Sequence, residues 1–407
     1  MDTLVIYQYQ YIIKNVVITA SKNYIFREGA VNYLFILHDY LHRKMPVIKM
    51  DIELSIPIIA DIYENKDTAI IKFDIYEQQI DATGKVVNTT LYMQHMFSII
   101  PAKDQNAYIT SQDTKSTKLI DEMKTLQLFE MYLVDMTAVN WFSQQICTIF
   151  QDVSKPAALQ ALFQMRDIPS GILIATPPQD NELIPYVMLP LGDLVGNIDT
   201  LNTVYGIYNA YPIIYYDLQY LYCINKYEPN ITLPTATDFG TIKFILANPD
   251  TSDRQVPGSY TDMESKTHYI NLINEPVIYD YTPKQTSTKF STITAIDVDG
   301  IVSKTTVDDS ATKLKYIYQQ NSMTVDQLKN EQLNGLNIDV SLNDSAVSFI
   351  KPFKTVLFEP DTQYLNLGID GKEFRITKWS ISITREGTGE KSKYIHDVNI
   401  SMYQPKV

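Results

Sequence analysis

Two histidines of this sequence have the spacing of a metal-binding pair. His38 and His42 form the pattern H-x-x-x-H, which on a helix places two imidazoles on one face for zinc. The segment around them, NYLFILHDYLH at 32–42, is interpreted as a strand, and it offers no adjacent glutamate and no third ligand. We therefore predict that both histidines lie at a sheet edge or in a loop, and that they hold no metal.

A second candidate is the D-x-D-G fragment in AIDVDGIVS at 295–303, which resembles part of a calcium loop. The full loop requires an oxygen donor where Ala295 stands and a glutamate where Thr306 stands. The fragment therefore predicts a tight hairpin turn.

The remaining reactive side chains are isolated. His95, His268 and His396 each stand alone in a strand pattern, which predicts core or surface histidines with hydrogen-bonded rings. Cys147 and Cys223 are too far apart to indicate a disulfide framework, and we expect two buried thiols in a protein made in a reducing cytoplasm. No nucleophile elbow, phosphate loop or C-x-x-C motif occurs. The sequence thus predicts no catalytic residue, cofactor site or metal site, and no enzyme.

The elements that surround these residues are mostly strands. In IKMDIELS (48–55), apolar and polar residues alternate as in a sheet with one buried face. A hairpin is predicted from 68–80 and 88–100 across the Gly-containing turn DATGK, and another strand pair from 23–28 and 32–42 around Gly29. An antiparallel sheet of about five strands, curled or closed, follows from this pattern.

The middle of the chain changes period after a polar stretch at 101–117. SKPAALQALFQM (154–165) predicts a short helix with Ser154 as N-cap, and 126–135 and 171–176 predict strands. A longer helix with Pro190 at its start is predicted from the apolar stripe Leu191, Leu194, Val195, Ile198, Leu201, Val204, Tyr205 and Tyr208. YPIIYYDLQYLYCI then predicts two short strands, so that a helix covers a small sheet.

The C-terminal half returns to strand patterns. The DGK at 370–372 and the GTGE at 387–390 are the clearest hairpin signals, while 320–332 fits either a helix or a long loop.

Composition restricts the function further. A net charge of −13 with a pI near 4.9 argues against a protein that binds phosphate through Lys and Arg. The acidic charge indicates either ordinary solubility or a surface along which nucleic acid passes without binding. The 29 tyrosines suit half-buried strands and subunit contacts. No signal peptide and no membrane span are expected from the N-terminus or from any apolar run.

Two stretches carry a resemblance to a known family. SKPAALQALFQMRDIPSGI followed by PPQDNELIPYVMLPLGDLVGNIDTLNTVYGIYNAYPIIYYDLQYLYCI, and YLNLGIDGKEFRITKWSISITREGTGEKSKYIHDVNISMY near the end, resemble the baseplate hub proteins of tailed bacteriophages and contractile injection machines. The first stretch matches the family's short helix, polar loop, second helix and turn into strands. The second matches the closing hairpins of a tube-like barrel.

The resemblance implies a mainly β protein with a smaller α/β part. It divides the chain into an N-terminal tube-like β-barrel (1–115), an α/β connector (116–235) and a C-terminal β domain with a second tube-like barrel (236–407). These two antiparallel barrels would flank or enclose the small helix-on-sheet domain.

The same resemblance implies a structural virion protein of the tail baseplate, made in the host cytoplasm. Three copies would form a pseudo-sixfold ring that joins the hexameric tail tube to the trimeric central spike, with baseplate wedge proteins as further partners. DNA would pass through an acidic channel without specific binding. The alternatives are a receptor- or carbohydrate-binding β-rich tail protein, which would cluster exposed aromatic residues on loops, and a hydrolase, which would need a cleft with a strongly shifted titratable group.

Overall fold

The structure is a computed structural model of residues 1–407. It describes residues 8–81, 83–104, 126–178, 181–208, 212–225, 337–343, 345–348, 350–360, 372–387 and 393–404. Between 242 and 336 it describes only the backbone of the strands, and the side chains of Asn343 and of 358–360 are likewise outside the description.

Most of the described chain forms one sheet, here called the main sheet, of fifteen strands. Its strands are β1 (Gln8–Thr19), β2 (Asn23–Ile25), β3 (Val31–Asp39), β4 (Val47–Ser55), β5 (Ile70–Ile80), β6 (Val86–Pro101), β7 (Leu126–Val134), β13 (Ile242–Leu246), β14 (Gly258–Thr261), β15 (Thr267–Leu272), β16 (Val277–Asp280), β19 (Leu336–Asn343), β20 (Thr355–Pro360), β21 (Glu373–Glu386) and β22 (Lys393–Tyr403). They lie in the order β14-β15-β19-β22-β21-β3-β4-β7-β6-β5-β1-β2, with β13, β16 and β20 beside this path.

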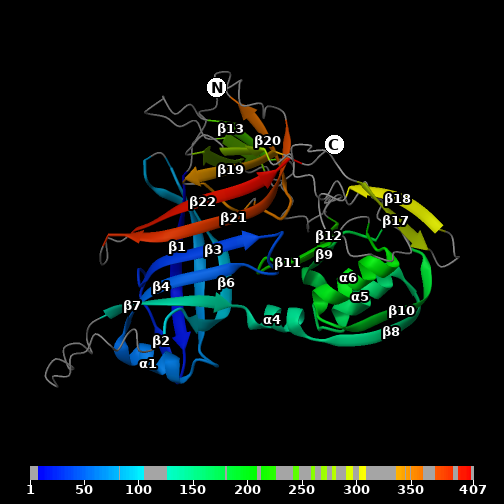
Figure 1. The fold of residues 1–407 in the computed structure, drawn as a ribbon. Helices are drawn as coiled ribbons and strands as arrows, with labels where there is room; N and C mark the ends of the chain where they lie inside the picture. Colours follow the sequence, from blue (N-terminus) through cyan, green and yellow to red (C-terminus); the bar gives the residue numbers. More distant parts are fainter. Residues whose placement is uncertain are drawn as a thin grey trace.

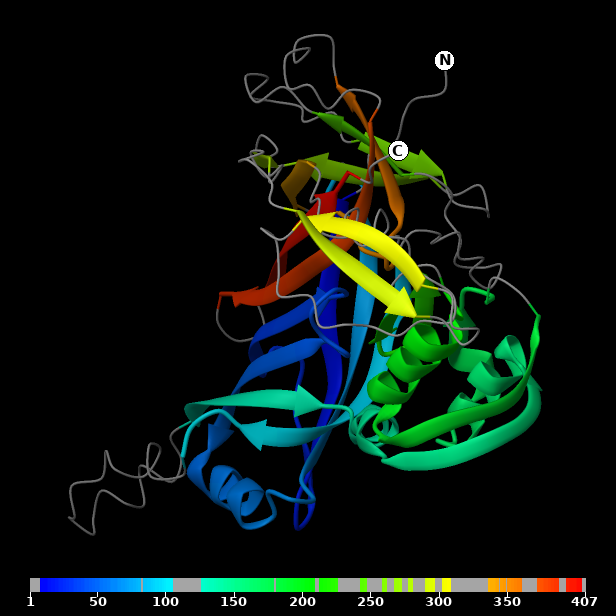
Figure 2. The same ribbon diagram turned by 45° about the vertical axis from the view of Figure 1, so that its right-hand side comes forward.

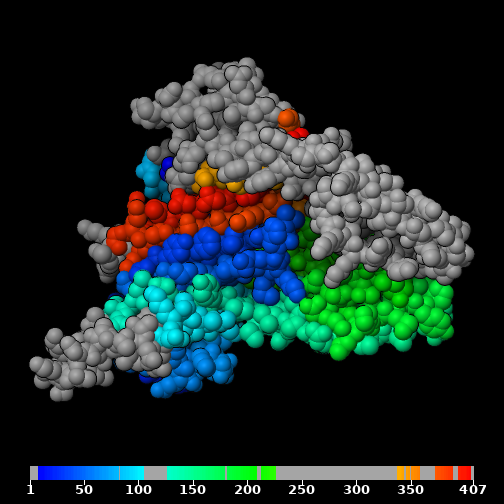
Figure 3. Space-filling model, viewed as in Figure 1, coloured from blue at the N-terminus to red at the C-terminus, as the bar shows by residue number. Residues whose placement is uncertain are grey.

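The main sheet joins the two ends of the chain. β3 pairs antiparallel with β21, with Leu34 opposite Ile383 and Leu37 opposite Ser380. In Figure 1 the strands β22, β21, β3, β4 and β7 form a front layer, and β1 and β6 cross behind it. The space-filling view shows the red, blue and teal rows of this layer side by side (Figure 3). Strands from both predicted β regions therefore share one sheet, while the boundaries at 115 and 235 stay a prediction.

The sheet curls around a single apolar core. Alternate residues of β4, among them Ile48, Met50 and Ile52, are fully buried there because each second side chain of a strand faces the same side. At the curl, β1 approaches β22: the Gln10 Nε2 donates a hydrogen bond of 2.7 Å to the Tyr394 carbonyl. The predicted class, mainly β with a smaller α part, is confirmed.

Several expected strands are confirmed, and one pairing is wrong. The hairpin across DATGK is present, since β5 pairs antiparallel with β6. The pair predicted around Gly29 does not form, because β2 pairs with β1 and β3 pairs with β4 and β21. Gly29 lies between β2 and β3 and has a φ of 87°, a left-handed conformation that glycine adopts readily. Local alternation identified these strands without identifying their partners.

The C-terminal hairpin at the GTGE segment also forms, because β21 pairs with β22 across it. β20 pairs antiparallel with β21, while Asp370 and Gly371 of the DGK signal lie outside the described residues. β17 (Phe290–Ile296) and β18 (Val302–Asp308) pair antiparallel around the D-x-D-G fragment, which confirms the hairpin. The segment 320–332, which fits either a helix or a long loop, lies outside the described residues.

A second part of the molecule, here called the middle unit, spans 136–225. It contains α4 (Met136–Ser143), β8 (Ile146–Ser154), α5 (Lys155–Gln164), the 3-10 turn η1 (Ser170–Ile172), β9 (Leu173–Ala175), β10 (Leu183–Gly192), α6 (Leu194–Tyr205), β11 (Pro212–Tyr216) and β12 (Leu221–Asn225). β8 and β10 form a two-stranded sheet, and β11, β12 and β9 a three-stranded one. In Figure 2 the helices α5 and α6 lie between these two sheets.

The helices begin where the sequence supplies capping side chains. Ser154 caps α5 as predicted, accepting a hydrogen bond from the Ala157 amide. The second helix is shorter than predicted: Pro190 and Leu191 belong to β10, and α6 begins after Asp193, whose carboxylate accepts from the Gly196 amide. β10 can contain Pro190 because this strand lies at the edge of a two-stranded sheet. α6 ends at Gly206, which adopts a left-handed conformation with a φ of 66°.

Two helices were not expected from the sequence. α1 (Ile56–Glu64) follows β4 directly, and α4 follows β7. Both carried a local signal: Pro57 stands in the first turn of α1, and Asp135 caps α4 by accepting from two backbone amides.

Candidate interaction site

The three-stranded sheet β11–β12–β9 connects the two parts of the molecule by being buried on both faces. Ile213, Tyr215, Tyr222 and Ile224 belong to the core of the main sheet, whereas Ile214, Tyr216, Leu221 and Cys223 belong to the core of the middle unit. This division follows from the period of two along each strand. A packed layer, rather than a flexible linker, thus joins the two parts.

An aromatic cluster holds the main-sheet side of this junction. The His38 ring stacks on Trp379 at 4.5 Å between centroids, and the Tyr215 hydroxyl lies 3.1 Å from the His38 Nδ1. The Trp379 Nε1 donates to the Tyr40 hydroxyl at 2.7 Å. The cluster therefore ties together β3, β21 and β11, three strands that are distant in the sequence.

Burial controls the charge of this cluster. It lowers the pKa of His38 to about 3, with a further contribution from the charge of Lys351, so the imidazole is neutral in the folded protein at pH 7. Burial likewise raises the pKa of Tyr215 well above its ordinary value, and that hydroxyl stays protonated.

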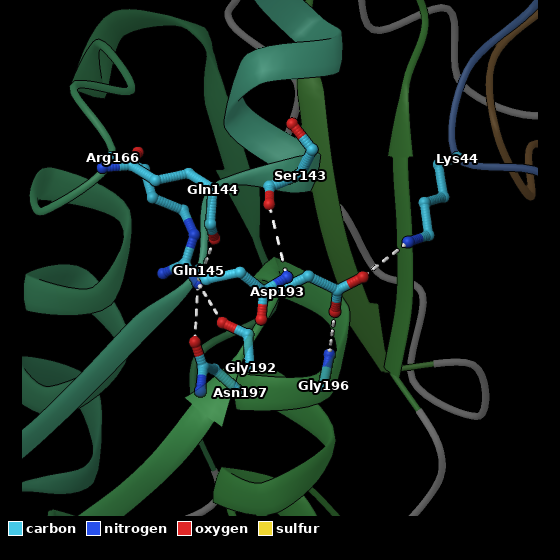
Figure 4. A network of polar contacts seen from close by, with 9 residues as sticks. All are labelled: Lys44, Ser143, Gln144, Gln145, Arg166, Gly192, Asp193, Gly196 and Asn197. Atoms are coloured by element: carbon cyan, nitrogen blue, oxygen red, sulfur yellow. Dashed lines mark hydrogen bonds and ion pairs between the residues drawn. The ribbon is translucent and has the colours of Figure 1, made fainter.

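A polar network holds parts of the middle unit together (Figure 4). The Arg166 guanidinium is buried and donates to the carbonyls of Leu162, Gln144 and Gly192 and, at 2.6 Å, to the Asn197 Oδ1. Asn197 in turn donates to the carbonyls of Ile146 and Pro190. One cation thus fastens the end of α5 to the starts of β8 and α6.

Lys44 extends this network to the main sheet. Its Nζ lies 3.0 Å from the Asp193 Oδ2, and its carbonyl accepts a hydrogen bond of 2.9 Å from the Tyr216 amide. Burial works to raise the pKa of Asp193, but the Gly196 amide and the two nearby cations together lower it. Burial lowers the pKa of Arg166, and the charge of Asp193 opposes that change. Asp193 therefore stays ionised while it caps α6.

The structure separates the two histidines of the H-x-x-x-H pattern. His38 is buried in β3, and His42 is exposed in the following turn, where its Nδ1 lies 3.0 Å from the Asp39 carboxylate. They share no site. Within the described ranges, no group of three or more His, Cys, Asp or Glu side chains is placed to hold a metal ion.

The other histidines lie in strands, as expected. The His95 Nε2 lies 2.8 Å from Asp135, the N-cap of α4, and the buried His396 Nε2 lies 3.1 Å from the Ser345 carbonyl. The side chain of His268, in β15, lies outside the described residues.

One cysteine prediction is wrong. Cys223 is buried, and burial raises the pKa of its thiol to about 12, whereas Cys147 is exposed. Ile146 occupies the inward position of β8, so the next residue faces outward. No local pattern in the sequence points to Arg166, Asn197 or Lys44. A signal exists only for Asp193, as a helix N-cap, because partners that lie far apart in the sequence leave no local pattern.

None of the helices in the described part of the chain is both long and apolar enough to cross a membrane.

Comparisons with known proteins support the fold. No family model and no curated protein matches the chain. Among solved structures, it is similar to a chain of the lidless PdpA–VgrG complex with a TM-score of 0.51 and 10% identity, over 99% of this chain and 66% of that one. This chain therefore spans just under two thirds of that relative. The likeness extends over both the main sheet and the middle unit.

Two further structures match at lower TM-scores. A tail protein from Neisseria meningitidis MC58 has a TM-score of 0.47 and 11% identity, covering 97% of each chain. The 43 kDa tail protein of prophage MuSo2 from Shewanella oneidensis has 0.44 and 12%, covering 96% of this chain and 97% of that one. Two of these three structures are tail proteins, and the third is a chain of a PdpA–VgrG complex.

Proposed function

We propose that this protein is a structural component of a phage tail, the baseplate hub. Three copies form a pseudo-sixfold ring between the hexameric tail tube and the trimeric central spike. The observation that carries the proposal is the likeness in fold, over 99% of the chain, to a chain from a complex that contains VgrG. The proposed role is assembly, without catalysis.

Two properties of the chain support this role. The main sheet pairs strands from both ends of the chain, which suits a rigid subunit that must transmit load. The net charge of −13 would let DNA pass a channel without being held, because binding to phosphates depends on Lys and Arg.

A receptor- or carbohydrate-binding role is less favoured by the surface. That role needs exposed aromatic side chains on loops. The exposed tyrosines of the described residues, Tyr132 and Tyr186, lie instead in β7 and β10. Aromatic residues in such positions suit contacts between subunits.

The test is the assembly state of the chain, alone and co-expressed with its tube and spike proteins. We expect light scattering to give a trimer and electron microscopy to show a ring with a hole wide enough for duplex DNA. A compact monomer in both preparations, with glycan binding on an array, would contradict the hub and favour the carbohydrate-binding role.

A further inference from the structure

The exposed apolar side chains of the described strands include two groups on different parts of the molecule. The first, here called the β6–β7 patch, consists of Met96, Ile100, Leu128 and Tyr132, each 43–57% exposed. The second, here called the β8–β10 patch, consists of Ile149, Tyr186 and Met188, each 59–61% exposed. Clustered apolar side chains of this size mark surfaces that contact other proteins.

Strand register pairs two members of each patch directly, whereas Met96 and Leu128 lie four residues along β6 and β7 from the first pair, toward opposite ends of the ladder. Ile100 stands directly opposite Tyr132, and Ile149 directly opposite Met188. The residues next to Met188 in β10, Val187 and Leu189, are buried in the core of the middle unit. Each patch is therefore the outer face of a sheet whose inner face is already packed.

Each patch has a charged residue beside it, and the two charges are opposite; Glu130, between Leu128 and Tyr132 in β7, already pairs with Lys49 and Lys103. Lys72 on β5 stands opposite Met96, and Asp152 on β8 follows Gln151, which stands opposite Tyr186. Neither charge has an ion-pair partner within the described part of the chain. Bringing the two patches together would pair a cation with an anion.

We propose that the β8–β10 patch of one copy packs on the β6–β7 patch of the next copy. This inference rests on the proposed ring. A ring of more than two subunits uses two different surfaces of each subunit, whereas a twofold dimer uses the same surface twice. The two patches meet this need, because one lies on the main sheet at β6 and β7 and the other on the middle unit at β8 and β10 (Figure 1). A twofold contact between two β8–β10 patches would instead bring Asp152 of one copy near Asp152 of the other, and these like charges would repel each other.

Cross-linking tests the contact directly. Cys147 is exposed on β8, two residues from Ile149, and the other cysteine is buried. Under mild oxidation, an Ile100→Cys variant should form disulfide-linked oligomers through the partner's Cys147. Ile100→Cys combined with Cys147→Ser should not form them, and neither should Ile25→Cys, which alters an exposed residue of β2.

The outcomes separate this inference from the proposed function. Rings that form without the cross-link would show that the subunits meet elsewhere, and would overturn the inference alone. If neither the wild type nor any variant assembles, both proposals fail. Capture of a different protein on the β8–β10 patch, while the copies stay apart, would also overturn the inference.

Charge exchange provides an independent readout. Lys72→Asp and Asp152→Lys should each raise the dissociation constant of the assembly by about tenfold, and the double variant should recover most of that loss. A double variant no better than either single one would contradict the contact. Met188→Asp should prevent assembly, whereas Ile25→Asp, at an exposed position of β2 outside both patches, should not.

Discussion

The main sheet pairs strands from opposite ends of the chain, whereas the middle unit is built from residues 136–225 alone. The β3–β21 ladder joins residues more than three hundred positions apart, and the core behind it is apolar and aromatic. The core of the middle unit is smaller and is bordered by the buried guanidinium of Arg166. The main sheet therefore depends on late, long-range pairing, while the middle unit depends on local caps and one polar network.

The variant with the largest expected effect is Leu201→Asp, in the core of the middle unit. Leu201 is 1% exposed in α6, so the new carboxylate has no water and no partner. We expect a loss of about 4 kcal/mol or more in the free energy of unfolding and no soluble assembly. Urea unfolding and size-exclusion chromatography measure both.

Val204→Asp is the matched control for this variant. Val204 lies one turn later in α6 and is 40% exposed. The substitution should therefore lower the free energy of unfolding by well under about 1 kcal/mol. Wild-type-like oligomers from Leu201→Asp would mean that the buried face of α6 is misassigned.

Arg166→Met tests the polar network on which the middle unit depends. The substitution keeps an unbranched apolar stem but leaves the Asn197 Oδ1 and the Gly192 carbonyl without their donor. We expect a loss of about 3 kcal/mol, measured by urea unfolding. Arg43→Met, at an exposed turn position, should change little. Equal stability of both variants would show that the network is dispensable.

The aromatic cluster of the main sheet should respond to pH through His38. Its pKa of about 3 in the folded state lies below its ordinary value of 6.5, so the unfolded state binds more protons between these values. The stabilising contribution of neutral His38 is therefore fully present above pH 6.5. As the pH falls from 6.5 toward 3, the free energy of unfolding decreases by about 1.4 kcal/mol per pH unit.

Comparison of two glutamine variants isolates this contribution. Between pH 4.5 and 6, His38→Gln should unfold with a shallower dependence on pH than the wild type. His42→Gln, at the exposed position, should retain the wild-type slope. Identical slopes for the wild type and both variants would exclude His38 as the source.

Trp379→Phe tests the hydrogen bond that links β21 to Tyr40. The smaller ring keeps the stacking on His38 but removes the indole donor, which should cost about 1–2 kcal/mol. Combining it with Tyr40→Phe should cost less than the sum of the single variants, because neither polar group is then left unpaired. A strictly additive cycle would argue against the bond.

The smallest effect is expected for Lys44→Ala, at the polar contact between the two parts. Its ion pair with Asp193 is partly exposed, and such pairs contribute about 0.5 kcal/mol. The difference should disappear in about 1 M salt, which screens exposed charges. A larger, salt-independent loss would indicate that the Lys44 stem packs on Phe142, over whose ring its Nζ lies.

The sequence predicted elements better than it predicted their partners. Alternation in 48–55 and the Ser154 cap are local signals, and both are confirmed. Gly29 was read as a hairpin turn, but strand pairing depends on which distant strand covers the exposed edge. Cys147 next to apolar residues suggested burial, yet its position in β8 turns it outward. No candidate site could be assembled from the sequence, because its residues come from separate elements.

The sequence by itself determined which segments are extended, where α5 begins, and that the chain is acidic and rich in tyrosine, because these depend on side chains a few residues apart. Only the tertiary structure decided that β3 pairs with β21 and that β11 and β12 are buried on both faces. It also placed Arg166 among carbonyls from three segments. These contacts form only when distant segments of the chain have come together, because the free energy that favours them comes from apolar surface that those segments bury jointly.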